Sequence, residues 1–152
     1  MIYLSALLIG VVAGLRAMTA PAVASWAARL GWLRLEGTPL AWMGMAVTPW
    51  IWSVLAVAEL VNDQLPKTPS RKAPPAFIAR IVMGALSGAC VGASAGMLAV
   101  GLLLGAIGAV IGTLGGYEVR KRLAAAFGRD LPAALIEDAI AIALALLAVR
   151  GR

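Results

Sequence analysis

The chain has 152 residues, 62% of them hydrophobic and 13% charged, with a mean hydropathy of +0.93. This composition excludes an ordinary soluble domain. The lack of histidine and the single cysteine, Cys90, exclude a histidine metal site, a cysteine cluster and an internal disulfide. The net charge of +6 is expected to serve topology and contact with anionic lipid, so nucleic acid is not an expected partner. We therefore expect an all-α, polytopic membrane helix bundle with about five transmembrane segments in one domain, residues 1–152.

The first predicted segment is a broken helix. It begins at Ile2, is disturbed around Arg16, Thr19 and Pro21, and can continue as an interfacial helix to Leu33. No positive residue precedes the apolar stretch and Arg16 interrupts it, so we expect a retained helix rather than a cleaved signal peptide. Two alternatives stay open: the segment crosses the membrane, or it re-enters and leaves on the side where it started.

The second predicted segment covers residues 39–62, with Pro49 at its middle. A polar loop, residues 64–75, follows it and contains four prolines. Prolines at this density exclude a helix and favour an extended, exposed chain.

The third and fourth predicted segments, roughly residues 76–95 and 98–117, form a helical hairpin. They share a run of 37 residues without a charge, 81–117, which holds ten of the 17 glycines. As a helix this run would be about 55 Å long, too long for one crossing of a hydrocarbon core about 30 Å thick. Most of its glycines recur every four residues and share a helix face, where another backbone can approach closely. The spacing breaks between Gly96 and Gly101, which predicts the turn. The glycines of this predicted Gly zipper are Gly84, Gly88, Gly92, Gly96, Gly105, Gly108, Gly112 and Gly116.

The fifth predicted segment covers residues 131–149, with Pro132 in its first turn, and a second polar loop, 118–130, precedes it. Eight lysines and arginines flank the two polar loops, against four at the opposite side. The positive-inside rule therefore predicts that loops 63–75 and 118–130 are cytoplasmic in a bacterial inner membrane, with the N-terminus inside and the C-terminus outside.

A short internal similarity links the first and fourth segments. Residues 10–14, GVVAG, resemble residues 108–112, GAVIG, and an acidic pair follows each of them one helix later. Many transporters are built from inverted halves, but these acidic pairs do not occupy equivalent places. The similarity is suggestive of a repeat without establishing one.

Arg16 is the charge most clearly out of place, because it lies 14 residues beyond Ile2 in an apolar segment. An arginine inside a membrane indicates a functional site by default, and its planar fork suits carboxylates and phosphates. Pro21 frees backbone carbonyls nearby, and transporters use broken helices of this kind to form polar sites in lipid. The alternatives are that Arg16 snorkels to the surface, or forms one static bridge to Glu59 or Glu137.

Two acidic pairs are predicted to lie near the cytoplasmic face at similar depth, where they can converge. Glu59 and Asp63 share a helix face, and such carboxylates repel unless a proton, an arginine or a cation separates them. Glu137 and Asp138 are adjacent, about 100° apart around the helix, so only one of them is expected to face a given partner. The alternative is that these acids reach water or pair with nearby cations. The predicted polar pathway or substrate site consists of Arg16, Thr19, Glu59, Asp63, Glu137 and Asp138. Its oxygens suit hard cations, and whether a metal binds is left open.

The first polar loop and the start of the next helix carry cations and hydroxyls that suit phosphates or lipid headgroups. The candidate contacts are Lys67, Ser70, Arg71 and Arg80. The spacing matches no nucleotide-binding loop, and a plain solvated loop is the alternative.

Several stretches together resemble a family of small bacterial membrane proteins known as domain of unknown function 4126. They are residues 14–22 (GLRAMTAPA), 58–66 (AELVNDQLP), 68–71 (TPSR), 115–117 (GGY) and 137–142 (EDAIAI). The resemblance implies the fold of that family. The family has no established activity, so it implies no catalytic residue.

No nucleophile–base pair, zinc motif or dinucleotide fingerprint is present, so we expect neither an enzyme nor a cofactor. We expect a small transporter or channel-like protein in the lipid bilayer. Five short helices enclose little volume, so we expect a homo-oligomer. Its partner would be a cation or another small solute. The alternative is a non-transporting structural or lipid-interacting membrane protein whose charges form internal bridges.

Overall fold

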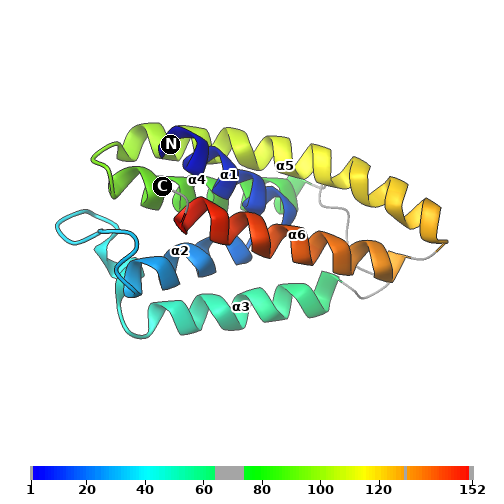
Figure 1. The fold of residues 1–152 in the computed structure, drawn as a ribbon, viewed down its shortest axis with the longest axis horizontal. Helices are drawn as coiled ribbons and strands as arrows, with labels where there is room; N and C mark the ends of the chain where they lie inside the picture. The colour runs from blue at the N-terminus through cyan, green and yellow to red at the C-terminus, as the bar shows by residue number, and fades with distance from the viewer. Residues whose placement is uncertain (1, 64–73, 129, 151–152) are drawn as a thin grey trace.

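The computed structural model describes residues 2–63, 74–128 and 130–150, and every regular element in these residues is helical (Figure 1). The elements are α1 Ile2–Leu15, α2 Thr19–Arg29, the 3₁₀ turn η1 Ala41–Gly44, α3 Thr48–Asp63, α4 Pro74–Ala93, α5 Leu98–Phe127 and α6 Asp130–Arg150. The expected all-α fold is confirmed, and α6 matches the fifth predicted segment closely.

Helix α3 is shorter than the second predicted segment. Residues 39–47 were predicted as helix, but they form η1 and connecting chain, so this part of the prediction is wrong. A helix through this region would place Pro49 in its interior, where proline removes a hydrogen bond and clashes with the preceding turn. In the structure Pro49 lies in the first turn of α3, where its missing N–H removes nothing.

Helix α5 extends past Tyr117, where the fourth predicted segment ended, so most of the predicted loop 118–130 is in fact helical. Residues 120–126 consist of arginine, lysine, leucine and alanine, which favour helix strongly. Gly128 follows α5 with φ 73°, a left-handed conformation that ends the helix. Helix α4 similarly begins at Pro74, inside the other predicted loop, because the first turn of a helix tolerates proline.

Glycines lie where the backbones of α4 and α5 approach each other closely. A Cβ added at Gly84 would lie 2.6 Å from the carbonyl oxygen of Gly105, and one at Gly88 would lie 2.7 Å from the Gly105 Cα. Gly92 and Gly101 meet in the same way, with 2.8 Å from the added Cβ of Gly92 to the Gly101 Cα. These distances leave no room for a side chain at the interface.

Gly96 has a different role from the packing role predicted for it. It lies in the turn between α4 and α5 with φ 73°, and no atom lies within 4 Å of an added Cβ. Glycine is needed here for the left-handed backbone rather than for close packing. Gly116 is buried in α5.

A second glycine face of α5 packs against α1. A Cβ added at Gly108 would lie 2.8 Å from the amide nitrogen of Val11, and one at Gly14 would lie 2.7 Å from the carbonyl carbon of Gly112. The similar sequences 10–14 and 108–112 therefore face each other across this interface. Helices α1, α4 and α5 form a scaffold with contacts between their backbones.

The chain turns back on itself between α1 and α2, and we call these two helices the re-entrant pair. The start of α1 lies beside the start of α5 and Gly14 lies beside Thr113, so the two helices run parallel. Helix α2 then turns back, and the ring of Trp26 lies edge-on to that of Trp50 near the start of α3, with 5.1 Å between centroids. The N-terminal and C-terminal ends consequently lie at the same end of the molecule (Figure 1). The N-terminus was expected at the end that carries the polar loops, and the structure favours the re-entrant alternative instead.

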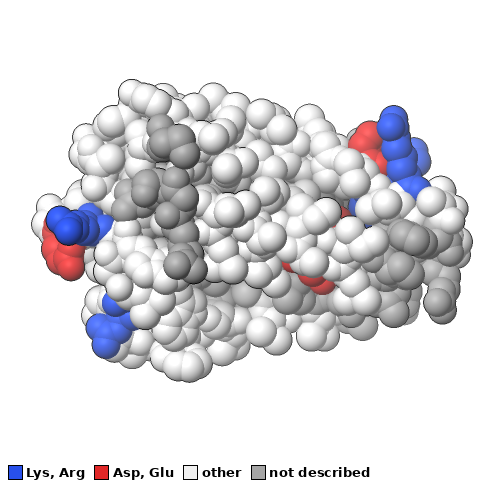
Figure 2. All heavy atoms as spheres, viewed as in Figure 1, with Lys and Arg blue, Asp and Glu red and all other residues white. Residues whose placement is uncertain are grey.

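Large apolar side chains cover the outside of the bundle, while several polar side chains lie inside. On α3, the side chains of Trp50, Val54, Val57 and Val61 are between 59% and 67% exposed, whereas Arg16 is only 1% exposed. Figure 2 shows charged side chains gathered at the two ends of the long axis, with a nearly uncharged band between them.

Two helical stretches in the described residues are long and apolar enough to cross a membrane. They are Ala76–Ala93 in α4 and Leu98–Leu123 in α5. Helix α1 is also apolar but has only 14 residues. The hairpin is thus the part of the molecule with the lengths and composition of membrane spans.

Candidate functional site

The connection between α1 and α2 is an unwound segment, residues 16–18. The Arg16 amide still donates to the Val12 carbonyl, 2.7 Å away, but the helix goes no further. Pro21 has no N–H to offer the carbonyl of Ala17, and its ring would clash with that carbonyl in a continuous helix. The break therefore leaves the last carbonyls of α1 and the amides of Ala17 and Met18 for partners inside the bundle.

Side chains from the scaffold hold the carbonyl end of the break. Arg80 of α4 donates from Nη1 to the Gly14 oxygen over 2.8 Å, and Thr113 of α5 donates to the same oxygen over 3.4 Å. Arg16 adds a longer contact from its own Nη1 to the Leu15 oxygen, 3.5 Å away. The carbonyl end of a helix carries a partial negative charge, so cationic donors suit it.

Arg80 was predicted to contact lipid headgroups, but the structure places it inside the bundle with 7% of its surface exposed. Its role at Gly14, and that of Thr113, are absent from the sequence prediction. One signal for Thr113 was available, since a hydroxyl inside the uncharged glycine run indicates a buried polar partner.

A carboxylate from α3 holds the amide end of the break. The Ala17 and Met18 amides donate to Oε2 and Oε1 of Glu59 over 2.9 Å and 3.0 Å. Met18 is the N-cap residue of α2 and provides no side-chain cap of its own. Glu59 therefore holds the two backbone amides that directly precede α2, and its negative charge suits the positive end of that helix.

Arg16 bridges the break to α6. Its Nε donates to Oδ1 of Asp138 over 2.5 Å, its Nη2 contacts the same oxygen, and its Nη1 lies 3.6 Å from Oε1 of Glu137. We expected only one of the two adjacent acids to face a given partner, and this expectation is wrong. The guanidinium fork is wide enough to reach both carboxylates, although their helix positions differ in direction.

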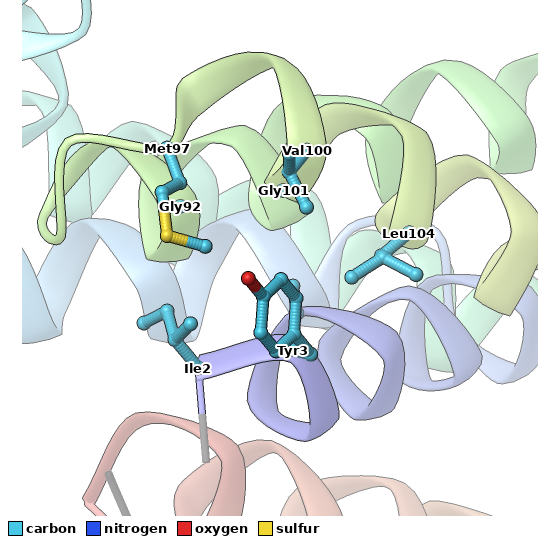
Figure 3. Close-up of a pocket in the computed structure, with 8 residues that line it drawn as sticks. Ile2, Tyr3, Gly92, Met97, Val100, Gly101 and Leu104 are labelled. Atoms are coloured by element: carbon cyan, nitrogen blue, oxygen red, sulfur yellow. The ribbon is translucent and has the colours of Figure 1, made fainter.

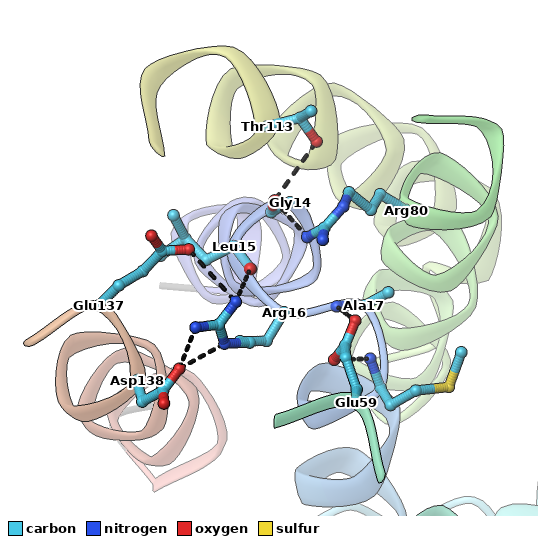
Figure 4. Close-up of polar contacts among 10 residues, drawn as sticks. Gly14, Leu15, Arg16, Ala17, Glu59, Arg80, Thr113, Glu137 and Asp138 are labelled. Carbon is cyan, nitrogen blue, oxygen red and sulfur yellow. Dashed lines mark hydrogen bonds and ion pairs between the residues drawn. The ribbon is translucent and has the colours of Figure 1, made fainter. Parts of the chain in front are cut away.

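The cluster at the break draws charge from both sides of the unwound segment. Figure 4 shows Glu59 on one side of Arg16 and the α6 pair, Glu137 and Asp138, on the other. The side chains of Arg16, Glu137 and Asp138 are 1%, 7% and 13% exposed. We call this set, together with Arg80 and Thr113, the break cluster.

The break cluster lies deep in the bundle but off its centre. Helix α1 has 14 residues, so the break is about 20 Å from the end where the chain starts. Glu59, Arg80 and Glu137 are four, six and seven residues from the nearer ends of their helices, which corresponds to about 6 to 10 Å. The site is thus closer to the end that carries the basic loops.

The other predicted site residues are placed differently. Thr19 is buried in the first turn of α2, with 6% of its surface exposed. Asp63 is the last residue of α3, and its side chain lies outside the described residues, as do Lys67, Ser70 and Arg71. In the part of the chain that the structure describes, no group of three or more acidic or cysteine side chains is arranged to hold a metal ion.

A separate recess lies at the far end of the scaffold, near the turn between α4 and α5 (Figure 3). Its lining is apolar apart from the hydroxyl of Tyr3. The lining residues are Ile2, Tyr3, Ala6, Gly92, Met97, Val100, Gly101 and Leu104. This recess is remote from the break cluster and carries no charge.

No protein-family model, curated protein or solved structure matches this chain. The fold and the break cluster themselves define the class of protein: an all-helical chain with a glycine-packed hairpin, a re-entrant helix pair and buried charges at the break between its two helices.

Proposed function

We propose that this chain is an integral protein of the bacterial inner membrane with about five membrane segments, the first of them the re-entrant pair α1 and α2. The apolar lengths of α4 and α5 support this proposal. So do the exposed apolar faces of the helices, which resemble surfaces in contact with lipid. By the positive-inside rule, the end with the basic loops is cytoplasmic. The resemblance to the bacterial family of unknown function agrees with this placement.

We propose further that the protein is a small transporter or channel-like protein for an ion or small solute. The observation that carries this proposal is the unwound segment 16–18, where backbone carbonyls, backbone amides and charged side chains meet inside the bundle. In lipid, irregular backbone is tolerated only where protein or a polar pathway covers it. Transporters use the ends of broken helices in this way to bind substrates and coupling ions.

The contacts of the break cluster are of a kind that a passing solute could replace for a time. The chain itself supplies a group of opposite charge at each helix end: Glu59 at the amides that precede α2 and Arg80 at the carbonyl of Gly14. A solute that passes the site would compete with these internal partners, and the contacts would reform after it leaves. A bundle of this size encloses little volume. We therefore propose that the protein is a homo-oligomer whose subunits share a pathway.

A second candidate is a non-transporting structural protein. The observation in its favour is that Arg16 and Glu59 already make direct contacts within the chain, to α6 and to the Ala17 amide. In that case the break cluster fixes the arrangement of the helices, and a reversed pair should restore it. Arg16→Asp combined with Asp138→Arg would then recover the stability that either single variant loses.

The two candidates can be separated by flux measurements. We would reconstitute the purified protein in liposomes and follow entry of K⁺, Na⁺, protons and Cl⁻ with fluorescent indicators. The transporter proposal expects flux above that of protein-free liposomes, reduced at least tenfold by Glu59→Gln and unchanged by Glu36→Gln, a change at an exposed acid outside the cluster. Absence of flux for every ion, with a restored reversed pair, would establish the structural candidate instead.

A further inference from the structure

We infer that the connection between α2 and α3, residues 30–47, is an interaction surface for lipid headgroups and lies in the interfacial layer of the membrane. This inference rests on the proposed membrane placement and names the part of the chain that contacts the headgroups. We call residues 30–47 the α2–α3 connection.

The α2–α3 connection is fixed to the bundle by its inner side chains. Leu33, Leu35 and Met43 are between 0% and 3% exposed and belong to the hydrophobic core. The Ser25 hydroxyl of α2 donates to the Met43 carbonyl, and the Thr38 hydroxyl donates to the Leu35 carbonyl over 2.6 Å. These contacts hold the connection in place, although its one regular element is the four-residue turn η1.

The same connection presents large apolar side chains outward. Trp42, Met45 and Val47 are 43%, 59% and 62% exposed. Two hydrogen bonds fold this stretch into a compact turn: the Met45 amide donates to the Trp42 carbonyl over 3.2 Å, and the Thr48 hydroxyl donates to the same carbonyl over 2.8 Å. Exposed apolar side chains that are grouped in this way mark a surface for a membrane or for another protein.

Continuity with α3 favours lipid over a protein partner. The Ile51 amide donates to the Val47 carbonyl over 3.1 Å, so Val47 is in helical register with α3. Val47, Trp50 and Val54 are spaced by three and four residues and therefore share a helix face. Trp50 and Val54 are exposed as well, on the face of α3 that we propose to be in contact with lipid. The apolar side chains of the connection thus extend a lipid-facing surface.

Backbone geometry limits the depth of the α2–α3 connection. Irregular backbone does not face lipid inside the hydrocarbon core, because its amides and carbonyls would lack partners there. The connection lies at the end of the bundle that also carries the turn between α4 and α5 (Figure 1). The two apolar stretches long enough to cross a membrane meet at this turn, so this end is at a membrane surface under the proposed placement. Apolar side chains on irregular backbone at that level belong to the interfacial layer, where tryptophan is enriched.

Two tryptophans near this end use their indole N–H groups differently. Nε1 of Trp26 donates to the Ser53 hydroxyl over 2.8 Å, so this ring serves the packing of α2 on α3. In the residues that the structure describes, the indole N–H of Trp42 donates to no protein group. A lipid carbonyl or phosphate oxygen at the interface would accept this hydrogen bond.

The charge of this stretch agrees with a phosphate partner. The exposed charged residues of positions 29–47 are Arg29, Arg34 and Glu36. Their formal charges sum to a positive value, and the guanidinium group donates well to phosphate oxygens.

The test measures the depth of single fluorophores in liposomes. In a Cys90→Ser background, Met45→Cys and, separately, Ile107→Cys would be labelled and reconstituted with lipids that carry a quencher either near the headgroup or near the end of the acyl chain. We expect the shallow quencher to act at least twofold more strongly than the deep one on the Met45→Cys label. Ile107 is exposed on α5, about 14 Å along the helix from Leu98, so we expect the reverse order at this control.

Variants of Trp42 test the aromatic contact. We expect Trp42→Ser to reduce shallow quenching at the Met45→Cys label at least twofold, and Trp42→Phe, which keeps an aromatic ring, to reduce it less. A Met45→Cys label that iodide quenches from the water, as a surface for a protein partner would allow, overturns the inference, and so does stronger quenching from the deep position. In both cases a deep Ile107→Cys label leaves the membrane placement standing. An Ile107→Cys label that neither lipid quencher reaches overturns the membrane placement, and the inference with it.

Discussion

At the scale of single residues, Arg16 is the centre of the molecule's electrostatics. Its side chain is 1% exposed and contacts Asp138 directly, so its charge depends on partners within the protein. Removing one member of a buried ion pair is more damaging than replacing both, because the remaining charge keeps its burial and loses its compensation. This difference makes the role of Arg16 measurable without any assay of function.

We predict that Arg16→Met lowers the free energy of unfolding by about 3 to 5 kcal/mol, because it leaves the α6 carboxylates buried without their cation. The double variant Arg16→Met with Asp138→Asn should recover part of this loss. Thermal unfolding in detergent would measure both. The exposed Arg29 gives the matched control, and Arg29→Met should change the stability by less than about 0.5 kcal/mol. Equal losses at the two arginines would contradict a buried ion pair.

Glu59 is the second residue whose contacts predict a local effect. Glu59→Gln keeps the size of the side chain, but its amide nitrogen cannot accept a hydrogen bond, so one of the Ala17 and Met18 amides loses its acceptor. We predict a loss of about 1 to 2 kcal/mol and faster hydrogen exchange at these two amides. Mass spectrometry of exchange in peptides that cover residues 16–20 would detect it. Unchanged protection in the variant would show that the capping contact is not formed in solution.

At the scale of secondary-structure elements, α5 is the common partner of the scaffold. One of its faces presents Gly101 and Gly105 to α4, and another presents Gly108 and Gly112 to α1. Without side chains on these faces, backbones approach closely enough for extensive van der Waals contact, which is the main attraction between helices in lipid. The scaffold also positions the break cluster, because Arg80 of α4 and Thr113 of α5 donate hydrogen bonds to the end of α1.

Two glycines of α5 give a matched test of this packing. We predict that Gly105→Ala destabilises the protein by about 1 to 3 kcal/mol, because the new methyl group would lie 2.9 Å from the Gly88 Cα and collide with the Gly84 carbonyl. Gly115→Ala meets no atom within 4 Å and should stabilise α5 by about 0.5 to 1 kcal/mol through helix propensity. Chemical unfolding of the two variants side by side would measure the contrast. A similar effect at both sites would exclude glycine-mediated packing.

At the scale of the whole molecule, a few charged side chains are buried in an otherwise apolar core, while large apolar side chains are exposed on the outside. Buried Arg16, Arg80 and Glu137 contrast with the exposed tryptophan and valines along α3. The re-entrant pair makes this possible, since it brings a helix break to the interior while both α1 and α2 start or end at one end of the molecule (Figure 1). An ordinary crossing in place of the pair would leave the N-terminus at the opposite end.

The re-entrant pair predicts which sites share a side of the membrane. In a Cys90→Ser background, a cysteine at Gly37 and a tag at the N-terminus should be accessible from the periplasmic side of intact cells. A cysteine at Lys121, close to the end of α5, should be labelled only after the membrane is opened. Labelling with a membrane-impermeant maleimide would measure this. An N-terminal tag on the same side as Lys121 would show that the first segment crosses the membrane.

The sequence by itself determined the helical class, the α4–α5 hairpin and the identity of most of the charged residues in the site. These properties depend on local composition and spacing: the uncharged run, glycines every four residues, and charges that interrupt apolar segments. Proline and glycine decided several boundaries, but their effect depends on where the helix begins. Residues 39–47 and 118–127 were consequently assigned wrongly, the first to a helix and the second to a loop.

Only the tertiary structure decided the direction of α2, the pairing of Arg16 with both acids of α6, and the position of Arg80 at Gly14. Each of these contacts joins residues far apart along the chain, and an arginine can satisfy several partners at similar cost. The sequence left Glu59 or Glu137 as alternative partners of Arg16. Packing assigned Glu59 to the amides of Ala17 and Met18 and the guanidinium to α6, because each helix end and each buried charge has to be compensated by the nearest group of opposite sign.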